Sequence, residues 1–599
     1  MTTKNQETIT GDISVHTGNI LPIIKKWLYS EQDIFLRELI SNAHDAILKR
    51  QKIALKENLG TVEGCINITL NAEKKTLTLS DNGLGMDSDE IQKYINQIAF
   101  SGAEEFVKKY EDKKDAGNII GHFGLGFYSA FMAADQVEIE SRSYREDAQA
   151  INWKCDGGTK FEITPSEKQT VGTDIILHLN TESEKYLKND LVETLIKKYD
   201  NFLPVEIQVE GKKINDQNPL WVKNPTDVTD EDYKVFYQTL FPFSQEPLFW
   251  IHLNVDFPFN LKGILYFPKL QSEMDFNKGQ VKLFCRQVFV TDNSKEVLPE
   301  FLSLLKGAID CPDIPLNVSR SYLQQDAYVQ KISKHIVKKI AEKLTSLFKN
   351  DRENFEKYWE DIHPFIKYGM MQDTEFYEKV KDITLFKTAS NTMTTLAEYL
   401  ERNKTEKVVY ASDKQTQAAY ISACQQQGLE VLILDNYIDT HFIQFLESKD
   451  SKIKYQAVDN SLSEAIEEKA EVTPKETDEK LTSFFKEALG KDLKIEIKPL
   501  KTQELSALIV EAEFSKRLKS MSVMMKGDFS QLPTDETLIL NQNSPIITKI
   551  DALAQAGNTE DATLLAQYVY DLALLSQKPL TGEQMQAFIA RSNKVLGKL

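Results

Sequence analysis

The sequence predicts an α+β protein built from several domains. At roughly 100–200 residues per domain, a chain of 599 residues has room for about three or four. Strand-like and helical patterns alternate through most of the chain, whereas its C-terminal part carries mainly helical periodicity. A hydrophobic fraction of 41% and a charged fraction of 27% are typical of globular domains with cores of their own.

The first region, residues 1–215, mixes helix and strand. Residues 34–57 follow a helical pattern, and residues 65–80 predict a hairpin in which a polar NAEKK turn joins INITL to TLTLS. Further strand patterns run through residues 135–180 and end in TDIILHLN. The short polar segment at residues 210–220 marks the first domain boundary.

The second region, residues 216–495, predicts two α/β parts, about 216–345 and 346–495. The first part holds a capped helix in WVKNPTDVTDEDYKVFY, strands in FWIHLNV and GILYFP, and then a long helix. The second part places the strand-like runs VVYAS and VLILD between helical segments. The charged run at residues 460–482 predicts a surface linker or an exposed loop. The third region, residues 496–599, ends in the helical patterns TEDATLLAQYVYDLALLSQ and GEQMQAFIARSNKVLGKL.

Charge and cysteine content narrow the functional classes. With 90 acidic and 72 basic residues the formal net charge is −18, which weighs against a dedicated nucleic-acid binder, because neutralising phosphates needs a basic surface. The five cysteines form no CxxC pair, and the eight histidines show no metal-ligand spacing such as HExxH. The sequence shows no signal-peptide core and no apolar run long enough to span a membrane. We therefore expect a cytoplasmic protein that binds neither nucleic acid nor a membrane.

Polar side chains line one face of the helix predicted at residues 34–57. The apolar residues of IFLRELISNAHDAILKR recur at helical spacing and predict a buried stripe. Glu38, Asn42 and Asp45 occupy the opposite face at i, i+4 and i+7. A carboxylate one turn from a carboxamide suits a general base beside an oxygen ligand for Mg²⁺. The same pattern also fits an ordinary solvated helix face.

Asp81 ends the strand pattern in TLTLSDNGLGM, on the same side as Leu77 and Leu79. A carboxylate at that position needs a partner, because burying an unpaired charge is costly, and an amino group of a bound ligand would serve. Gly83 and Gly85 follow at once and permit a flat ligand to approach the backbone closely. The alternative is a common Asp-Asn-Gly turn at the end of a strand.

A glycine-rich segment precedes an apolar helical run in IIGHFGLGFYSAFM. Gly121, Gly124 and Gly126 would expose backbone N–H groups there, and a helix N-terminus favours anions such as phosphate. The spacing is neither that of a Walker loop nor that of a dinucleotide fingerprint, and a lone glycine cluster has low specificity. The polar stretch before it predicts a mobile lid over about residues 100–126.

Four segments, taken in order, closely resemble the four nucleotide-site motifs of the split-ATPase superfamily: RELISNAHDA, DNGLGM, GHFGLGFYS and GTDIILHL. Their residues resemble those of the heat-shock protein 90 family in its bacterial form. Three segments further along the chain resemble later regions of the proteins of that family: PLWVKNPTDVTDEDYKVFY, DIPLNVSRSYLQQ and LILNQNSPII. The resemblance implies an N-terminal split-ATPase α/β sandwich (1–215), an α/β middle domain (216–495) and a mainly helical C-terminal dimerisation domain (496–599). It also implies an ATP-dependent chaperone that assists client proteins through a clamp cycle, with slow Mg²⁺-dependent ATP hydrolysis.

The resemblance further assigns roles to individual residues. Glu38 would be the general base, Asn42 would hold Mg²⁺ with the ATP phosphates, and Asp81 would accept from the adenine amino group. Arg320 would reach the γ-phosphate as an arginine from the same chain, and Gln324 would assist it, which suits a reaction that depends on positioning and charge. The remaining nucleotide contacts are Asp45, Gly85, Met86, Gly121, His122, Phe123, Gly124, Leu125, Gly126, Phe127 and Thr173.

Three positions depart from the family pattern. Phe100 stands where lysine is usual, His122 where glutamine is usual, and His44 where serine is common. The base, the Mg²⁺ ligand and the adenine acid are intact, so we expect hydrolysis. Two other functions stay open, namely a nucleotide-gated scaffold with little turnover and a DNA-repair ATPase of the same superfamily, which the net charge disfavours.

The expected partners are a second copy of the chain, unfolded or partly folded client proteins, and other chaperones. Apolar residues in the final helices have bundle-like spacing, which predicts a permanent homodimer through about residues 540–599. These residues are Leu564, Leu565, Tyr568, Leu572 and Leu575. The alternative is that they pack only within the chain.

Overall fold

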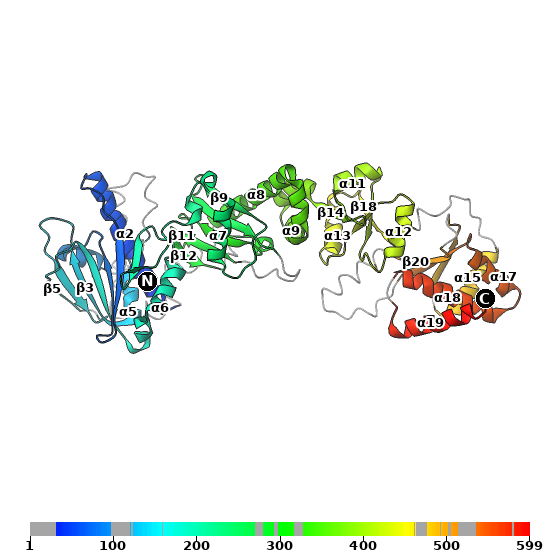
Figure 1. Ribbon diagram of the computed structural model, residues 1–599, viewed down its shortest axis with the longest axis horizontal. Helices are drawn as coiled ribbons and strands as arrows, with labels where there is room; N and C mark the ends of the chain where they lie inside the picture. Colours follow the sequence, from blue (N-terminus) through cyan, green and yellow to red (C-terminus); the bar gives the residue numbers. More distant parts are fainter. Residues whose placement is uncertain are drawn as a thin grey trace, which may run out of the picture. The chain divides into compact units, whose positions relative to one another are not determined.

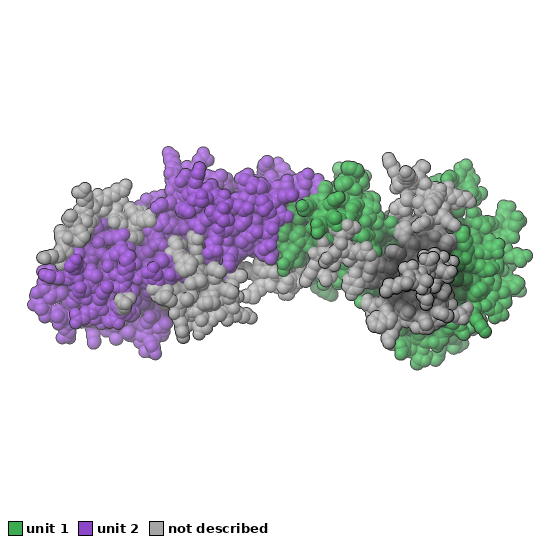
Figure 2. Space-filling view, turned by 180° about the vertical axis from the view of Figure 1, so that it is seen from behind, with its two compact units in different colours: residues 1–337 green, residues 338–599 purple. Residues whose placement is uncertain are grey.

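The structure, a computed structural model, describes residues 31–97, 120, 124–158, 160–269, 280–292, 297–316, 327–460, 462, 476–491, 493–500, 505–512, 515, 535–577 and 580–598. The chain forms two compact units, residues 1–337 and 338–599 (Figures 1 and 2). The division between them lies close to the predicted division between the two parts of the middle region. The domain limits at residues 215 and 495 stay predictions.

The first sheet of unit 1 has eight strands in the order β5-β4-β3-β6-β2-β1-β7-β8. Its strands are β1 Cys65–Asn71, β2 Thr76–Asp81, β3 Ala134–Arg142, β4 Ile151–Cys155, β5 Phe161–Pro165, β6 Gly172–Leu179, β7 Glu206–Val209 and β8 Lys212–Lys213. The helices of this part are α2 Ile34–Lys56, α3 Ser88–Tyr94, the 3-10 helix η3 Gly126–Ser129, α5 Ala130–Ala133, the 3-10 helix η4 Thr181–Leu187 and α6 Asn189–Tyr199. Antiparallel pairing of β2 with β6 places Asp81 opposite Thr173.

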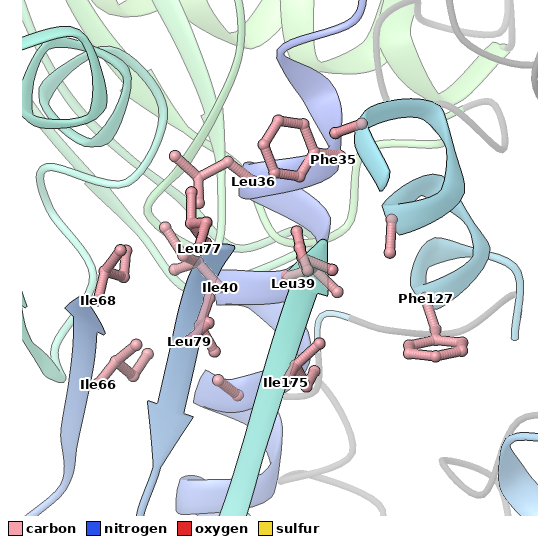
Figure 3. Packing of buried hydrophobic residues seen from close by; sticks show 14 of the residues in the cluster. Phe35, Leu36, Leu39, Ile40, Ile66, Ile68, Leu77, Leu79, Phe127 and Ile175 are labelled. Atoms are coloured by element: carbon pink, nitrogen blue, oxygen red, sulfur yellow. The ribbon is translucent and has the colours of Figure 1, made fainter. Parts of the chain in front are cut away.

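The sheet packs against α2 through one buried hydrophobic cluster. The helix contributes Leu39 and Ile40, and the strands contribute Leu77, Leu79 and Ile175. Figure 3 shows these side chains gathered between the helix and the strands. Because apolar residues recur at helical spacing on α2 and at every second residue on β2, each element buries one face. The helix is thereby fixed on the sheet, and its polar side chains take set positions.

A second sheet, of five strands in the order β12-β11-β13-β10-β9, follows in unit 1. Its strands are β9 Phe249–Val255, β10 Leu261–Phe267, β11 Val281–Cys285, β12 Val288–Thr291 and β13 Lys306–Asp310. The helices here are η5 Leu220–Val222, η6 Pro225–Asp227, α7 Asp230–Leu240 and η7 Glu300–Leu302. The long helix α8, Ala327–Asn350, begins in unit 1 and ends in unit 2. The ring centroids of Phe202 and Trp221 lie 4.8 Å apart, and those of Tyr199 and Phe289 lie 6.1 Å apart. Aromatic contacts therefore join the region of the first sheet to the second.

Unit 2 begins with helices and a five-stranded sheet in the order β15-β14-β17-β16-β18. Its strands are β14 Leu385–Thr388, β15 Met393–Thr395, β16 Lys407–Ala411, β17 Val431–Ile433 and β18 Lys454–Ala457. Its helices are α9 Arg352–Gln372, α10 Thr374–Val380, η8 Lys381–Ile383, α11 Leu396–Asn403, α12 Ala418–Gln426 and α13 Asp439–Lys449. A buried ion pair, with Lys367 Nζ 2.5 Å from Asp439 Oδ1, ties α9 to α13.

The C-terminal part of unit 2 combines helices with a three-stranded sheet in the order β19-β21-β20. Its elements are α15 Glu476–Leu489, β19 Lys494–Lys498, β20 Ala507–Glu511, β21 Glu536–Asn541, α17 Pro545–Gln555, α18 Thr559–Gln577 and α19 Gly582–Leu596. Phe485 of α15, Ile550 of α17 and Val569 of α18 share one buried cluster with the sheet. By contrast, α19 leaves Met585 and Ile589 exposed.

Most of the expected elements are confirmed. The helix at 34–57 is α2, the hairpin at 65–80 is β1 and β2, and the strands within 135–180 are β3 to β6. One expectation is wrong, because the charged run at 460–482 is not wholly a loop: α15 takes its last residues and packs into the C-terminal core. The charges there lie on an amphipathic helix. Within the described ranges, no helix is long and apolar enough to cross a membrane.

Candidate functional site

Glu38 lies in the second turn of α2 and is almost completely buried, with 2% of its surface exposed. Its Oε1 pairs with Nη2 of Arg37 at 3.0 Å, and the Arg37 guanidinium lies over the ring of Tyr199, 5.7 Å from its centroid. Its other carboxylate oxygen lies against Gly126, since a Cβ added to that glycine would be 2.7 Å from Oε2. The carboxylate is therefore held between a counter-charge and the glycine-rich segment. A carboxylate held in a fixed orientation is able to accept a proton from a water molecule within hydrogen-bond reach.

Asn42 and Asp45 continue the polar side of α2. Asn42 is half-buried, one turn after Glu38. Asp45 is buried, and its Oδ1 accepts a hydrogen bond from the backbone N–H of Ile120 at 2.8 Å. Among the residues described, no group of three or more His, Cys, Asp or Glu side chains could hold a metal ion. The Asn42 side-chain oxygen is of the kind that Mg²⁺ takes as a ligand beside phosphates.

Asp81 closes β2 with 8% of its surface exposed. Its Oδ1 accepts a hydrogen bond from the backbone N–H of Gly83 at 2.8 Å. Burial raises the pKa of Asp81 to about 7; the Gly83 bond lowers this pKa, Asp174 raises it, and Lys168 and Arg50 lower it. A hydrogen-bond donor on a bound ligand would stabilise the ionised form of this carboxylate.

A row of hydrogen bonds runs beside Asp81. The Met86 backbone N–H donates to Ser141 Oγ at 2.8 Å. Ser141 Oγ in turn lies 3.0 Å from Thr173 Oγ1, and Thr173 is the cross-strand neighbour of Asp81. Ser141 and Thr173 are both buried. The predicted base-binding residues Asp81, Met86 and Thr173 are therefore brought together, with Ser141 between two of them.

Glycine is required at two points of the site. Gly85 has a φ of +64°, and a Cβ there would collide with the carbonyl oxygen of Arg142. Gly126 begins η3 directly against Glu38, where a Cβ would crowd the carboxylate. The described part of the glycine-rich segment, Gly124, Leu125, Gly126 and Phe127, leads into η3. Phe127 belongs to the same buried hydrophobic cluster as the side chains between α2 and the sheet.

The two ends of the site are connected through α2. At the Asp81 end, the Leu84 backbone N–H donates to the Ala46 carbonyl at 3.2 Å, and Arg50 Nη1 donates to the Asn82 carbonyl at 2.7 Å. At the other end stands Glu38. Eight residues of α-helix separate Glu38 from Ala46, which is roughly 12 Å along the helix axis. The spacing suits an elongated ligand with a hydrogen-bonding base at one end and phosphates at the other.

Several predicted residues lie outside the described residues, and their roles stay predictions. They are Gly121, His122 and Phe123 of the glycine-rich segment, Phe100 with most of the predicted lid at about 100–126, and Arg320 with Gln324.

Two residues of the site were not predicted from the sequence. Arg37 pairs with Glu38, but nothing in the helical periodicity distinguished it from an exposed arginine. Ser141 links Met86 to Thr173. Its direction was available from the strand pattern, because it shares the parity of the buried Ile139.

Two family models match the chain. The model described as Hsp90 protein matches residues 197–598, and the model described as histidine kinase-, DNA gyrase B-, and HSP90-like ATPase matches residues 29–171. Chaperone protein HtpG of Porphyromonas gingivalis is 43% identical over 576 residues, covering 90% of this chain and 84% of that protein. Chaperone protein HtpG of Bacteroides thetaiotaomicron is 44% identical over 577 residues, with the same coverage. The TNF receptor-associated protein 1 homolog, mitochondrial, of Dictyostelium discoideum is 31% identical over 607 residues, covering 97% of this chain and 85% of that protein.

Proposed function

This chain belongs to the heat-shock protein 90 family of ATP-dependent molecular chaperones, and we propose that ATP lies along α2, with its base at Asp81 and its phosphates at Glu38. The observation that carries the proposal is the position of two buried carboxylates at the two ends of the site, Glu38 on α2 and Asp81 at the end of β2. Glu38 lies against the glycine-rich segment at Gly126, and Asp81 lies beside the Thr173–Ser141 row. The chain is an ATPase. In the proposed site, Glu38 would act at the phosphates and Asp81 would bind the base.

At the phosphate end, Glu38 accepts a proton from the water that attacks the γ-phosphate. The ion pair with Arg37 keeps the carboxylate oriented, and Gly126 leaves room for the reacting groups beside it. Backbone N–H groups of the glycine-rich segment hold the phosphates. The proposed roles of Arg320 and Gln324 at the γ-phosphate rest on the sequence motif alone.

We also propose that Mg²⁺ is the cofactor and that Asn42 supplies its protein oxygen. A single carboxamide oxygen fits an ion that takes its other ligands from phosphates and water. When bound, Mg²⁺ supplies neutralisation of the phosphate charge. Asp45 stabilises this end of the site by accepting a hydrogen bond from the backbone N–H of Ile120.

At the base end, Asp81 accepts a hydrogen bond from the adenine amino group. Thr173 and Ser141 form the polar row beside it, and Met86 with Gly85 lines the flat face of the base. The same amino group distinguishes adenine from bases that present an acceptor at this position, because Asp81 in its ionised form offers only acceptors.

The chain acts on client proteins, and we propose that it does so as a homodimer joined through α18 and α19. The exposed apolar side chains on these helices are Leu572, Leu575, Met585, Ile589 and Leu596. Exposed apolar groups gathered on two adjacent helices favour a protein partner. Tyr568 stacks on Phe588 at a ring distance of 5.7 Å, so this member of the predicted set packs within the chain. A cytoplasmic location and an exchange of clients with other chaperones belong to the same proposal.

Steady-state ATP hydrolysis by the full-length protein tests the proposal, with Glu38→Ala as the variant and Glu57→Ala as the matched control. Glu57 is exposed at the end of the same helix. We expect slow Mg²⁺-dependent turnover that falls roughly 10²–10⁴-fold in Glu38→Ala and is retained in Glu57→Ala. Equal turnover in both variants would show that Glu38 is not the general base. ATP binding without turnover by the unmodified chain would instead favour the nucleotide-gated scaffold.

A further inference from the structure

Arg50 is a cationic residue at the base end of the site that the proposed reaction does not use. It lies on α2 one helical turn after Ala46 and is half-buried. Its Nη1 donates a hydrogen bond to the carbonyl oxygen of Asn82 at 2.7 Å. Because Asn82 directly follows Asp81, the guanidinium is bonded to the backbone of the turn that leaves β2.

The side chain of Asn82 fixes the other side of this turn. Its Oδ1 accepts a hydrogen bond from the backbone N–H of Cys65 at 2.9 Å, and its Nδ2 donates to the carbonyl oxygen of Glu63 at 2.6 Å. The turn also lies directly against α2, because a Cβ added to Gly83 would be 2.6 Å from Cβ of Ala46. A turn that is held by hydrogen bonds on both sides keeps the groups that it carries in set positions. The guanidinium supplies the side-chain bond on the side of α2.

The charge of Arg50 also acts on Asp81. Burial raises the pKa of Asp81 to about 7, and the positive charges of Lys168 and Arg50 oppose this rise. Lys168 Nζ lies 2.5 Å from Asp174 Oδ2, so the first of these positive charges is accompanied by a negative charge that raises the pKa of Asp81. Burial lowers the pKa of Arg50 and the Asp81 carboxylate raises it, as expected of two groups that stabilise each other's charged form.

We propose that Arg50 is a positioning residue for the base end of the nucleotide site, acting through the Asn82 carbonyl on the turn and through its charge on Asp81. The hydrogen bond holds the turn against α2, so that the Asp81 carboxylate and the backbone up to Met86 keep the places at which the base would bind. The positive charge favours the ionised carboxylate, which offers only acceptors to the amino group of the base. This role rests on the proposed nucleotide site and adds to it a residue that acts through its neighbours.

The ionisable surroundings of Asp81 come from the elements that pack against β2, which are β1, β6, η4 and α2. Their ionisable residues are Cys65 of β1, Asp174 and His178 of β6, Glu182, Glu184, Lys185 and Tyr186 of η4, and Arg37, Glu38, His44, Asp45, Lys49, Arg50, Lys52 and Lys56 of α2. Lys168 precedes β6 in the sequence. The charges that act on the pKa of Asp81 include those of Asp174, Lys168 and Arg50.

Calorimetric titration of the full-length protein with ADP tests the inference between about pH 9 and pH 6, on either side of the pKa of Asp81. The measured quantity is the dissociation constant of Arg50→Met divided by that of the unmodified chain. Protonation of the ADP phosphates is common to both proteins and cancels in this ratio. At about pH 9 we expect a ratio of roughly three, because the turn has lost a hydrogen bond to α2. The ratio should rise a further threefold to tenfold, roughly, towards about pH 6, because loss of the positive charge raises the pKa of Asp81 and one pKa unit corresponds to a factor of about ten. A ratio that stays the same at every pH would overturn the inference.

Arg50→Lys is the conservative variant. Lysine keeps a positive charge and N–H donors, so its ratio should change little with pH, whereas a merely structural role of the guanidinium predicts no difference in pH dependence between lysine and methionine. Lys56→Met is the matched control, because Lys56 is exposed in the last turn of the same helix and its loss changes the net charge equally. Its ratio should stay close to one at every pH. A rise in Arg50→Lys or in Lys56→Met equal to that in Arg50→Met would overturn the action of the Arg50 charge on Asp81.

Hydrogen exchange in the ligand-free protein separates this inference from the proposed nucleotide site. The Gly83 amide donates to Asp81 Oδ1 at 2.8 Å, and the Leu84 amide donates to the Ala46 carbonyl at 3.2 Å. We expect both amides to be less protected in Arg50→Met than in the matched control, because the turn is held less firmly against α2. Equal protection would overturn the role of Arg50. Lower protection in a folded protein that binds no ADP would instead mean that the nucleotide site is wrong.

Discussion

The proposed nucleotide-site region, around α2 and the end of β2, and the C-terminal helices α18 and α19 depart from the usual pattern of burial in opposite ways. Around α2 the structure buries charged side chains, among them Arg37, Glu38 and Asp81. On α18 and α19 it exposes apolar ones, such as Leu575 and Ile589. A buried charge needs a partner within the chain or on a ligand, whereas an exposed apolar face favours another protein surface. The first region is thus suited to a small polar ligand and the second to association.

The largest expected effect tests the buried charges. Arg37→Met leaves Glu38 buried without the counter-charge 3.0 Å away, and removing one member of a buried pair costs about 3–5 kcal/mol. We expect a loss of that size in the stability of α2, measured by hydrogen exchange of its peptides in the full chain. Lys75→Met is the matched control, because Lys75 pairs with Glu184 at 2.6 Å on the surface. Exposed pairs contribute only about 0–1 kcal/mol. Similar losses in both variants would remove the distinction between the two pairs.

The next effect tests the exposed apolar face. Ile589 on α19 is 52% exposed, and Ile589→Asp would place a charge in the proposed dimer interface. Loss of about 2–3 kcal/mol at a central contact raises the dimer dissociation constant roughly 30–150-fold. Light scattering at decreasing concentration should therefore show monomers of Ile589→Asp where the unmodified chain is dimeric. Ala590→Asp adds the same charge at the next, exposed residue of the helix. Equal dissociation of both variants would point to charge rather than to the apolar contact.

Strand β2, which ends at Asp81, shows which features of the fold a local sequence pattern predicts. Leu77, Leu79 and Asp81 share one parity, and the structure buries all three, as alternation predicts. Periodicity gives the side to which a residue points and the bounds of a local element. It also located the hairpin of β1 and β2, because a short turn makes that pairing local.

Local sequence patterns did not predict the features that depend on residues distant in the sequence. Strands β19 and β21 pair in parallel across a long stretch of chain, in a region that the sequence predicts as mainly helical. The Asp45 contact joins α2 to Ile120, and the Arg37 guanidinium lies over the ring of Tyr199, which is distant in the sequence. Such contacts are set by tertiary packing, so no local pattern contains them.

The smallest predicted effect concerns Asp81, and its sign follows from the direction of the pKa shift. Burial raises the pKa of Asp81 from 3.8 to about 7. Between these values the folded chain binds a proton at Asp81 that the unfolded chain has released. The contribution of Asp81 to the free energy of unfolding therefore falls as the pH rises from about 4 to about 7, and it is constant above that range. A ligand that donates to the ionised form reverses this loss, because it lowers the pKa of Asp81.

The dissociation constant of ADP with Asp81→Asn measures how much the charge of Asp81 contributes to binding at the base end of the site. An asparagine keeps the size of the side chain but replaces a charged acceptor by a neutral one, which weakens a hydrogen bond by about 1 kcal/mol. At about pH 8 we expect the dissociation constant to rise roughly fivefold to tenfold. Below about pH 7 the difference should narrow, since the carboxylate becomes protonated in the unmodified chain. A difference that stays the same from about pH 8 to pH 5 would show that Asp81 binds the base without a change of charge, and that the nucleotide-site region tolerates an uncompensated buried carboxylate.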